Sequence, residues 1–447
     1  MLVFNIPELF YVDMLSMIMI SLVSFVGIVV SIFSKNYMKG DSSYRTFFLK
    51  ILLLLVSVIV MAIADNLLLF LTAWFFSNIM ISQLIVHKQS WKAAQASGRI
   101  TLQNFSKGFL SIGFAFAILY ILTGSLSLQY IIHNSDHSLY TFIALILLLI
   151  GAMKQSAIWP FHRWLISSLN SPTPVSAIMH AGIVNGGGFL LARFAPLYFG
   201  YPSILNLIFV VGCISVLLGS FWKLVQNDIK RMLACSTMGQ MGFMFVQCGL
   251  GLFSSAIAHL FLHGMFKAYM FLNSASAGQE KRADVPYVLT MFGFLLSLIC
   301  GVFGSYIFSI VHGQDFFVLD TTIIPSVIVF MACCQLALTM LVSASLKKFP
   351  LVFFASGIFS MLYGAIVYFF DWLLLPLNLM QPQVLNVFHI IALILFVLAW
   401  FLVVCLKSLH SSYSLPDWFL YVYVKTLNSS QPDISTITSY RKEYDYE

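Results

Sequence analysis

The sequence predicts an all-α fold, that of a polytopic integral membrane protein with about 13 transmembrane helices. Of its 447 residues, 60% are hydrophobic and only 9% are charged, whereas a soluble domain carries about 25% charged residues. The mean hydropathy of +0.94 agrees, because so few charges could not solubilise a surface of this size. The apolar runs are continuous and do not alternate, which favours helices over a β-barrel.

About thirteen apolar runs approach the roughly 20 residues that a helix needs to cross a bilayer. In chain order they cover residues 11–33, 47–64, 66–86, 107–125, 139–155, 175–197, 203–224, 232–251, 255–277, 286–311, 323–345, 351–375 and 385–407. Prolines between the fifth and sixth runs predict at least one broken helix. No stretch indicates a soluble domain.

The positive charges predict how the helices are oriented. Lys and Arg follow the first, third, seventh, ninth, eleventh and last runs, as Lys35, Lys39, Arg45, Lys50, Lys88, Lys92, Arg99, Lys107, Lys223, Lys230, Arg231, Lys281, Arg282, Lys347, Lys348, Lys407 and Lys425. Residues 133–137 and 312–320, which join other runs, contain neither Lys nor Arg. By the positive-inside rule, the N-terminus is expected outside and the C-terminal tail in the cytoplasm. The formal charge of +7 therefore reflects topology, and nucleic acid is not an expected partner.

Three smaller features concern processing and packing. No positive residue precedes Lys35, so no cleavable signal peptide is expected. The seven cysteines lie within or beside the apolar runs without metal-type spacing, which indicates packing residues and not a disulfide framework. The polar tail after about Asn428 is expected to be mobile.

Lys154 ends the apolar run TFIALILLLIGAMK. Ionisable groups inside spans usually mark a pathway, because they are costly there. Pro160, Pro172 and Pro174 follow closely, and proline cannot donate a backbone hydrogen bond, so the helix should be interrupted. Broken helices at membrane depth commonly line ion sites. The alternative is that Lys154 snorkels to the cytoplasmic interface.

Histidines and a second lysine follow in later runs. His180 comes six residues after Pro174 and could relay protons, although for this residue taken alone a hydrogen-bonded core histidine is the preferred interpretation. His259, His263 and Lys267 are spaced i, i+4, i+8, which places them along one helical face. Two histidines at i, i+4 can also bind zinc, but no carboxylate or cysteine beside them completes a ligand set. The spacing therefore favours a proton relay, and no metal site is expected.

Other charged residues have plainer interpretations. Arg193 lies in the same run as His180, where it could neutralise a carbonyl end or a lipid head group. Asp228, Lys230 and Arg231 lie at a cytoplasmic helix start, where Asp complements the helix dipole and the two bases hold the interface. A gating role is the alternative to this structural one. Asp371 and His389 are isolated, and packing is the preferred interpretation for both.

These stretches resemble the proton-conducting subunits of respiratory complex I and of Mrp antiporters. The resemblance is carried by MKQSAIWPFHRWLISSLNSPTPVSAIMHAGIVNGGGFLLAR, NDIKRMLACSTMGQMGFMF and AIAHLFLHGMFKAYMFLNSAS, with weaker matches in SKNYMKGDSSYRTFF and MAIADNLLLFLTAW. In that family a Lys in a broken helix, a His in the next span and a later His/His/Lys series form a proton path. The resemblance thus implies a path through Lys154, His180, His259, His263 and Lys267.

The chain departs from this family pattern in two places. The family carries Trp followed by Glu in an early core span, and the Glu pairs with the broken-helix Lys. Here Trp74 is followed by Phe75, so the carboxylate is absent. The family also carries a Lys in a second-half broken helix, and the corresponding stretch MFGFLLSLICGVFGSYIFSI has none.

The ending LPDWFLYVYVKTLNSS is similar to the short tail of the DabB family, the membrane subunits of DAB inorganic-carbon pumps. This resemblance implies a bacterial inner (plasma) membrane and a partner like DabA, a large soluble or peripheral zinc protein similar to β-type carbonic anhydrases. The membrane subunit would let protons or another cation run inward, while the partner hydrates CO2 to bicarbonate. The zinc would belong to the partner. This chain is then expected to be a transporter subunit with no cofactor and no catalytic residue.

The same resemblance divides the chain into four expected parts. Residues 1–46 would form an N-terminal span and cytoplasmic loop, 47–285 an antiporter-like proton-conducting core, 286–410 divergent C-terminal helices and 411–447 a cytoplasmic tail. One alternative function is a subunit of a complex I-like, hydrogenase-linked or Mrp-type antiporter assembly. Another, suggested by the missing carboxylate, is a membrane scaffold with a dead channel.

Overall fold

The computed structural model describes residues 9–274, 290–313, 320–341, 348–409 and 417–437, and their regular structure is helical with no strand. The main helices are α1 (Met14–Tyr37), α2 (Tyr44–Ile63), α3 (Leu67–Ile85), α4 (Lys92–Thr123), α5 (Leu128–Asn134), α6 (Leu139–Gln155), α7 (Arg163–Ser167), α8 (Thr173–Ala181), α9 (Gly186–Arg193), α10 (Ala195–Phe199), α11 (Pro202–Val225), α12 (Ile229–Gly249), α13 (Phe253–Leu272), α14 (Met291–His312), α15 (Ile323–Met340), α16 (Phe349–Leu374), α17 (Val387–Leu409) and α18 (Asp417–Ser429).

The expected fold class is confirmed. In the described part of the chain, ten segments are long and apolar enough to cross a membrane, counting α8 to α9 as one. The shorter α6 and the more polar α12 and α13 occupy three further predicted runs, so each predicted run contains a helix. The end of the run 255–277, the start of the run 286–311, and Lys281, Arg282 and Lys347 lie outside the described residues.

Two gaps between the predicted apolar runs are shorter in the structure. The runs 66–86 and 107–125 leave a gap, but α4 already begins at Lys92. Its first turns are held by contacts to the α7 region, since Ser97 Oγ donates to Ser167 O at 2.7 Å and Asn170 Nδ2 donates to Ala93 O at 3.2 Å. These contacts extend the helix beyond its apolar part. Likewise, α1 runs to Tyr37 and α2 begins at Tyr44, which leaves only 38–43 between them.

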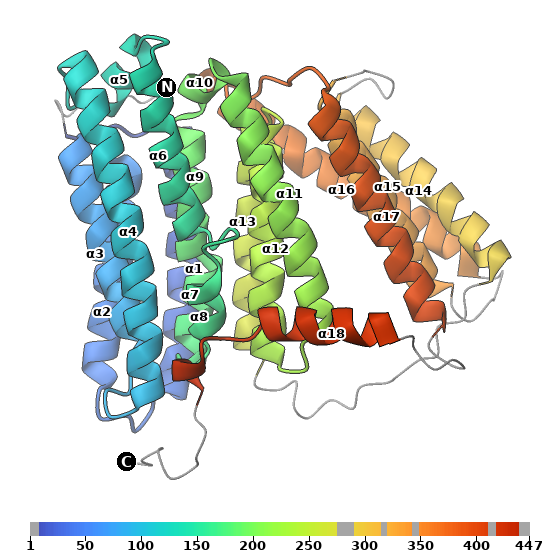
Figure 1. Ribbon diagram of the computed structural model, residues 1–447, viewed down its shortest axis with the longest axis horizontal. Helices are drawn as coiled ribbons and strands as arrows, with labels where there is room; N and C mark the ends of the chain where they lie inside the picture. Colours follow the sequence, from blue (N-terminus) through green and yellow to red (C-terminus); the bar gives the residue numbers. More distant parts are fainter. Residues whose placement is uncertain (1–8, 275–289, 314–319, 342–347, 410–416, 438–447) are drawn as a thin grey trace. The chain divides into compact units, whose positions relative to one another are not determined.

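The chain divides into two compact units. The first contains residues 1–249, 259–280 and 422–447, and therefore α1 to α12 and most of α13. Within it, α11 and α12 run side by side (Figure 1) and approach closely at glycines. A Cβ at Gly219 would lie 2.5 Å from Gly239 N, and one at Gly242 would lie 2.7 Å from Val216 N. Small residues allow this approach, which is how helices associate without a hydrophobic driving force in lipid.

The second unit contains residues 250–258 and 281–421. Its helices α14, α15 and α16 pack together (Figure 1) around Cys300, Ala337 and Val352.

All seven cysteines are unpaired and six are buried, so their predicted role as packing residues is confirmed.

The residues just after α18 are fixed by hydrogen bonds, contrary to the expectation of a mobile tail. Gln226 Nε2 donates to Ser430 Oγ at 2.5 Å, and Arg231 Nη1 donates to Gln431 Oε1 at 2.9 Å. Asn170 Nδ2 donates to Thr436 O at 2.8 Å. The polar residues of 430–437 thus bind polar groups of the first unit, which composition alone could not indicate.

Arg193 joins three helices of the first unit. Its guanidinium forms an ion pair with Asp13, the N-cap of α1, and donates to Ser16 Oγ at 2.9 Å and to Ala62 O at 3.2 Å. The side chains of Arg193 and Asp13 are both 6% exposed. The prediction that Arg193 binds the carbonyl end of a helix was right in part, because it donates to Ala62 O near the end of α2. The prediction that it binds a lipid head group was wrong, since Asp13 is its counter-charge.

We predict that Arg193→Ala destabilises the protein by about 3–5 kcal/mol, because it leaves a buried carboxylate without its partner. Reversible unfolding in mixed detergent, followed by tryptophan fluorescence, measures this. Arg99→Ala is the matched control, since Arg99 is exposed on α4 and should change stability by less than about 0.5 kcal/mol. Equal stability of Arg193→Ala and wild type would contradict a structural role for the pair.

Candidate proton-transfer site

The helix that carries Lys154 ends one residue later, as the prolines predicted. Residues 156–162 are non-helical, and Pro160 lies among them. Pro172 is the N-cap of α8 and Pro174 lies in its first turn, where proline is tolerated because its missing N–H has no helical partner. The predicted break is therefore confirmed, and the chain re-enters the bundle as the short helix α7 and then α8.

A second break lies between α8 and α9, at Gly182–Asn185, which sequence reasoning did not predict. The carbonyls of this segment are bound by the first break. Ser156 Oγ donates to Val184 O at 2.7 Å, and Gln155 Nε2 donates to Ile183 O at 3.3 Å. Buried backbone groups must find such partners, because each unsatisfied group is costly. The two breaks thus stabilise each other directly beside Lys154.

Lys154 is buried, with 9% of its surface exposed. Its Nζ lies 3.8 Å from the centre of the Phe161 ring, a cation–π distance. Gly108 of α4 gives it room, since a Cβ at Gly108 would lie 3.3 Å from Lys154 Cβ. Within the described ranges Lys154 takes part in no ion pair.

The position where the family pattern has a carboxylate carries an aromatic ring. Phe75 packs on Phe109 of α4 with ring centres 4.8 Å apart and is 36% exposed. Asn78 lies three residues after Phe75 on α3 and is 1% exposed. Its Oδ1 accepts from Gln155 Nε2 at 3.1 Å. Two neutral amides, Asn78 and Gln155, therefore bind each other, with Gln155 one residue along the chain from Lys154.

His180, Thr237, Leu233 and Lys267 form one hydrogen-bonded chain. Lys267 Nζ and Thr237 Oγ1 both donate to Leu233 O, at 2.9 and 3.0 Å. His180 Nδ1 lies 3.1 Å from Thr237 Oγ1. Because the threonine hydrogen is used on Leu233 O, the histidine must donate from Nδ1, which leaves Nε2 as an acceptor. Sequence reasoning missed Thr237 and the carbonyl of Leu233.

His259 and His263 lie along the same face of α13 as Lys267, as their spacing predicted. Their rings are nearly parallel, with centres 6.0 Å apart. His263 is 6% exposed and Lys267 is fully buried. The Nε2 atoms of His180, His259 and His263 are buried and have no hydrogen-bond partner within the described residues. Three imidazole nitrogens are thus available to accept or donate a proton.

Asn185 lies between Lys154 on one side and the basic residues of α13 on the other. A Cβ at Gly264, which follows His263, would lie 2.8 Å from Ala181 O and 3.3 Å from Asn185 Nδ2. Asn185 is fully buried, and its Oδ1 has no partner among the described residues. The second break therefore touches Gln155, next to Lys154, through Ile183 O and touches α13 through Asn185. Asn185 and Gln155 could have been suspected as polar residues inside apolar runs.

The charged residues at the start of α12 behave as the structural interpretation expected. Asp228 Oδ1 accepts from Arg231 N at 2.8 Å and so caps the helix. Lys230 Nζ donates to Ser171 O at 3.2 Å. These contacts tie the loop before α8, the start of α12 and the residues after α18 together.

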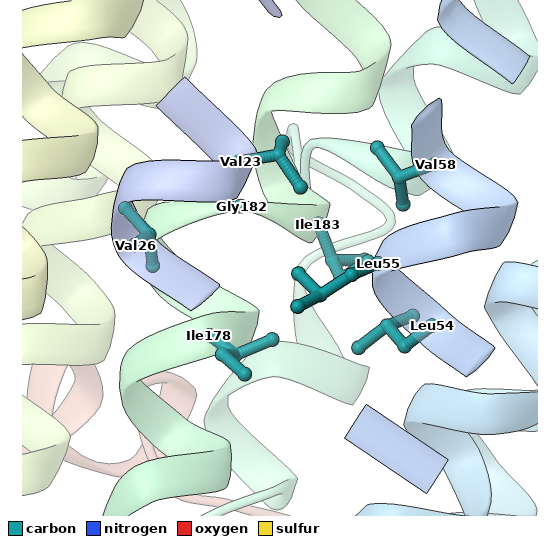
Figure 2. Close-up of a pocket in the computed structure, with 8 residues that line it drawn as sticks. All are labelled: Val23, Val26, Leu54, Leu55, Val58, Ile178, Gly182 and Ile183. Atoms are coloured by element: carbon teal, nitrogen blue, oxygen red, sulfur yellow. The ribbon is translucent and has the colours of Figure 1, made fainter. Parts of the chain in front are cut away.

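Figure 2 shows a small crevice between α1, α2 and the second break. It is lined by Val23, Val26, Leu54, Leu55, Val58, Ile178, Gly182 and Ile183. Its volume of about 10 Å³ gives room for about one water molecule, far below the roughly 300 Å³ of a small-molecule site. In the described part of the chain, no three His, Cys, Asp or Glu side chains are grouped to hold a metal ion.

Comparisons with known proteins agree with this arrangement. Residues 64–306 match the family described as NADH:quinone oxidoreductase/Mrp antiporter, TM, and residues 3–48 match the complex I chain 5 N-terminus. The Mrp complex from Dietzia sp. has a similar fold, with a TM-score of 0.58 and 20% identity over 94% of this chain and 48% of that chain. The fold and the buried basic residues define a membrane subunit of the antiporter-like class.

The chain belongs to the NADH:quinone oxidoreductase/Mrp antiporter transmembrane family. It is 41% identical over 281 residues to the probable inorganic carbon transporter subunit DabB1 of Halothiobacillus neapolitanus, covering 61% of this chain and 50% of the relative. It is 37% identical over 303 residues to the probable subunit DabB of Bacillus subtilis, covering 65% and 60%.

NADH-quinone oxidoreductase subunit L of Escherichia coli is 36% identical over 283 residues, covering 61% of this chain and 46% of the relative. The chain thus spans about half the length of the curated relatives it matches. The predicted resemblance to DabB subunits and to complex I and Mrp subunits is confirmed. These relatives are membrane subunits of multi-subunit assemblies.

We predict that Gly264→Ala destabilises the first unit by about 1–3 kcal/mol, because a methyl group there overlaps Ala181 O. The same displacement would move His263 and lower proton flux. Gly113→Ala is the matched control, since a Cβ on this α4 glycine meets nothing within 4 Å, so it should be neutral or stabilising by up to about 1 kcal/mol. Unfolding in detergent and flux in proteoliposomes would be compared, and two indistinguishable variants would contradict the close packing.

Proposed function

We propose that this protein conducts protons across a bacterial inner membrane and energises an inorganic-carbon uptake complex. The observation that carries the proton path is the buried chain of His180, Thr237, Leu233 O and Lys267, with His259 and His263 on the same face of α13. Three basic groups on one buried helical face are costly to keep. Proton exchange accounts for them, whereas packing does not.

In this proposal Lys154 receives a proton and passes it by way of water to the second helix break. Asn185 there contacts α13 beside Gly264. His263, His180 and Lys267 then exchange the proton within the first unit. Moving one charge across 100 mV supplies about 2.3 kcal/mol. Lys154 Nζ lies over the Phe161 ring and takes part in no ion pair within the described residues, so its protonated form is held without a fixed counter-ion.

The carbon-uptake part of the proposal is supported by the inorganic-carbon transporter subunits among the relatives. We propose a partner like DabA that holds zinc and hydrates CO2, with this chain supplying the proton flow. The N-terminus would lie outside and the C-terminus in the cytoplasm, as the positive charges predict. The enzyme chemistry would be the partner's, and Lys154, His180, His259, His263 and Lys267 would form the path in this chain.

Lys267→Arg should reduce proton flux on the order of 10²-fold. Arginine keeps the positive charge but does not release its proton in proteins, and losing a positioned proton carrier has an effect of about this size. Flux into proteoliposomes is measured with an enclosed pH-sensitive dye under an imposed potential. Lys223→Arg is the matched control, since Lys223 is exposed at the end of α11. Undiminished flux in Lys267→Arg would reduce Lys267 to a fixed charge.

Purification of the tagged protein in mild detergent should bring down one large zinc-containing protein. Loss of the gene should impose a high-CO2 requirement in a strain with no second carbon pump. Copurification of iron–sulfur or several antiporter subunits would instead select the alternative, a complex I-like, hydrogenase-linked or Mrp-type assembly. That alternative rests on the likeness to subunit L and to the Mrp fold. Normal function of Lys154→Ala and Lys267→Ala would support a scaffold with a dead channel.

A further inference from the structure

The second unit contains a buried acid that the proposed path does not use. Asp371 lies near the end of α16, and its Oδ2 is 2.6 Å from Nε2 of His312, the last residue of α14. Ser254, in the first turn of α13, donates its hydroxyl to Asp371 Oδ1. The sequence analysis treated Asp371 as an isolated packing residue. Asp371 is not isolated, because its partners lie 59 and 117 residues away in the chain.

The pair is sheltered from solvent. The side chain of His312 is 4% exposed and that of Asp371 is 15% exposed. Asp371 is the sole acidic residue in α14, α15, α16 and α17. The ring of Phe308 lies over His312 with centres 5.5 Å apart. The one carboxylate of these four helices therefore lies beside an imidazole.

Other titratable groups of the surrounding segments are bound elsewhere or face away. Asp320 Oδ1 accepts from Thr322 N at 2.8 Å. His389 of α17 accepts from Asn386 N through Nδ1 at 3.3 Å. Tyr306 and Tyr368 are more than half exposed, and residues 250–258 carry no titratable side chain apart from the hydroxyls of serine. Tyr363 of α16 stacks on Phe308 with ring centres 5.5 Å apart, and His312 is the ionisable group bound to Asp371.

The geometry at His312 distinguishes a proton carrier from a simple anchor. An anchoring ion pair needs one nitrogen of the imidazole, which Nε2 supplies. The other nitrogen, Nδ1, is buried and has no hydrogen-bond partner in the described part of the chain. With the proton on Nε2, Nδ1 carries a free lone pair at which a proton can bind.

We propose that Asp371 and His312 form a second proton-exchange site, which binds and releases one proton in each transport cycle. A proton taken up at Nδ1 gives an imidazolium whose charge the Asp371 carboxylate balances. The Nε2 proton then moves to Oδ2, which leaves a neutral imidazole and a neutral carboxylic acid. When the carboxyl proton returns to Nε2 and the proton on Nδ1 is released, the starting pair is restored. Ser254 holds the carboxyl in place throughout, and the inference rests on the proposed proton conduction.

Infrared difference spectra of the detergent-solubilised protein test proton binding without transport. Between about pH 4 and 9, where ordinary carboxyl and imidazole groups titrate, the protein should show the carbonyl band of a protonated carboxyl that forms and disappears. Asp371→Asn should remove this band. Asp320→Asn, the matched control from the same unit, should retain it. If Asp371→Asn does not fold, Asp371→Glu decides: a shifted band supports the site and an unchanged one overturns it.

Proteoliposome flux then tests the role in transport. We expect Asp371→Asn and His312→Gln to lower flux at least about tenfold, Asp371→Glu to recover part of it, and Asp320→Asn to match wild type. Flux that is lost in Lys267→Arg but intact in a folded Asp371→Asn would overturn this site and leave the proposed function standing. If the wild-type protein conducts no protons at all, the proposed function fails, and the infrared titration alone decides whether Asp371 binds a proton.

Discussion

The structure of the first unit depends on one constraint, that every backbone group freed inside a membrane must find a partner in the protein. The segments 156–162 and Gly182–Asn185 each interrupt a helix, and the side chains of Ser156 and Gln155 bind carbonyls of the second segment. In the first segment, Trp159 N donates to Ser215 Oγ of α11. With such groups bound, the protein can bring a lysine, amides and backbone carbonyls into one buried region, which a continuous helix could not do.

Glycine and the other small residues give the rest of this arrangement its shape. Gly264 lets α13 approach the second break, and Gly108 lets α4 approach Lys154. The close approach replaces the hydrophobic driving force that lipid removes. The position of the basic groups therefore follows from residues that carry no charge. The same contacts set the positions of the proposed path residues and the packing of the helices.

The sequence predicted the number and order of the helices, since long apolar runs and prolines are strong local signals. It also placed His259, His263 and Lys267 on one face, because helical periodicity is local. It did not predict Thr237, the carbonyl of Leu233 or the partner of Asp371, because these contacts join residues far apart in the chain. Arg193 was recognised as unusual, but its counter-charge Asp13 lies 180 residues earlier.

The ion pair of Arg193 and Asp13 has a consequence for biosynthesis. A ribosome makes Asp13 180 residues before Arg193, so α1 and α2 enter the membrane while their shared partner has not yet been translated. Until α9 arrives, the acid at the start of α1 has to stay hydrated at the membrane surface or take up a proton. The contacts of Arg193 with α1 and the end of α2 can form only once α9 has been made. Substitutions at Arg193 would then act on insertion and quality control as much as on the finished protein.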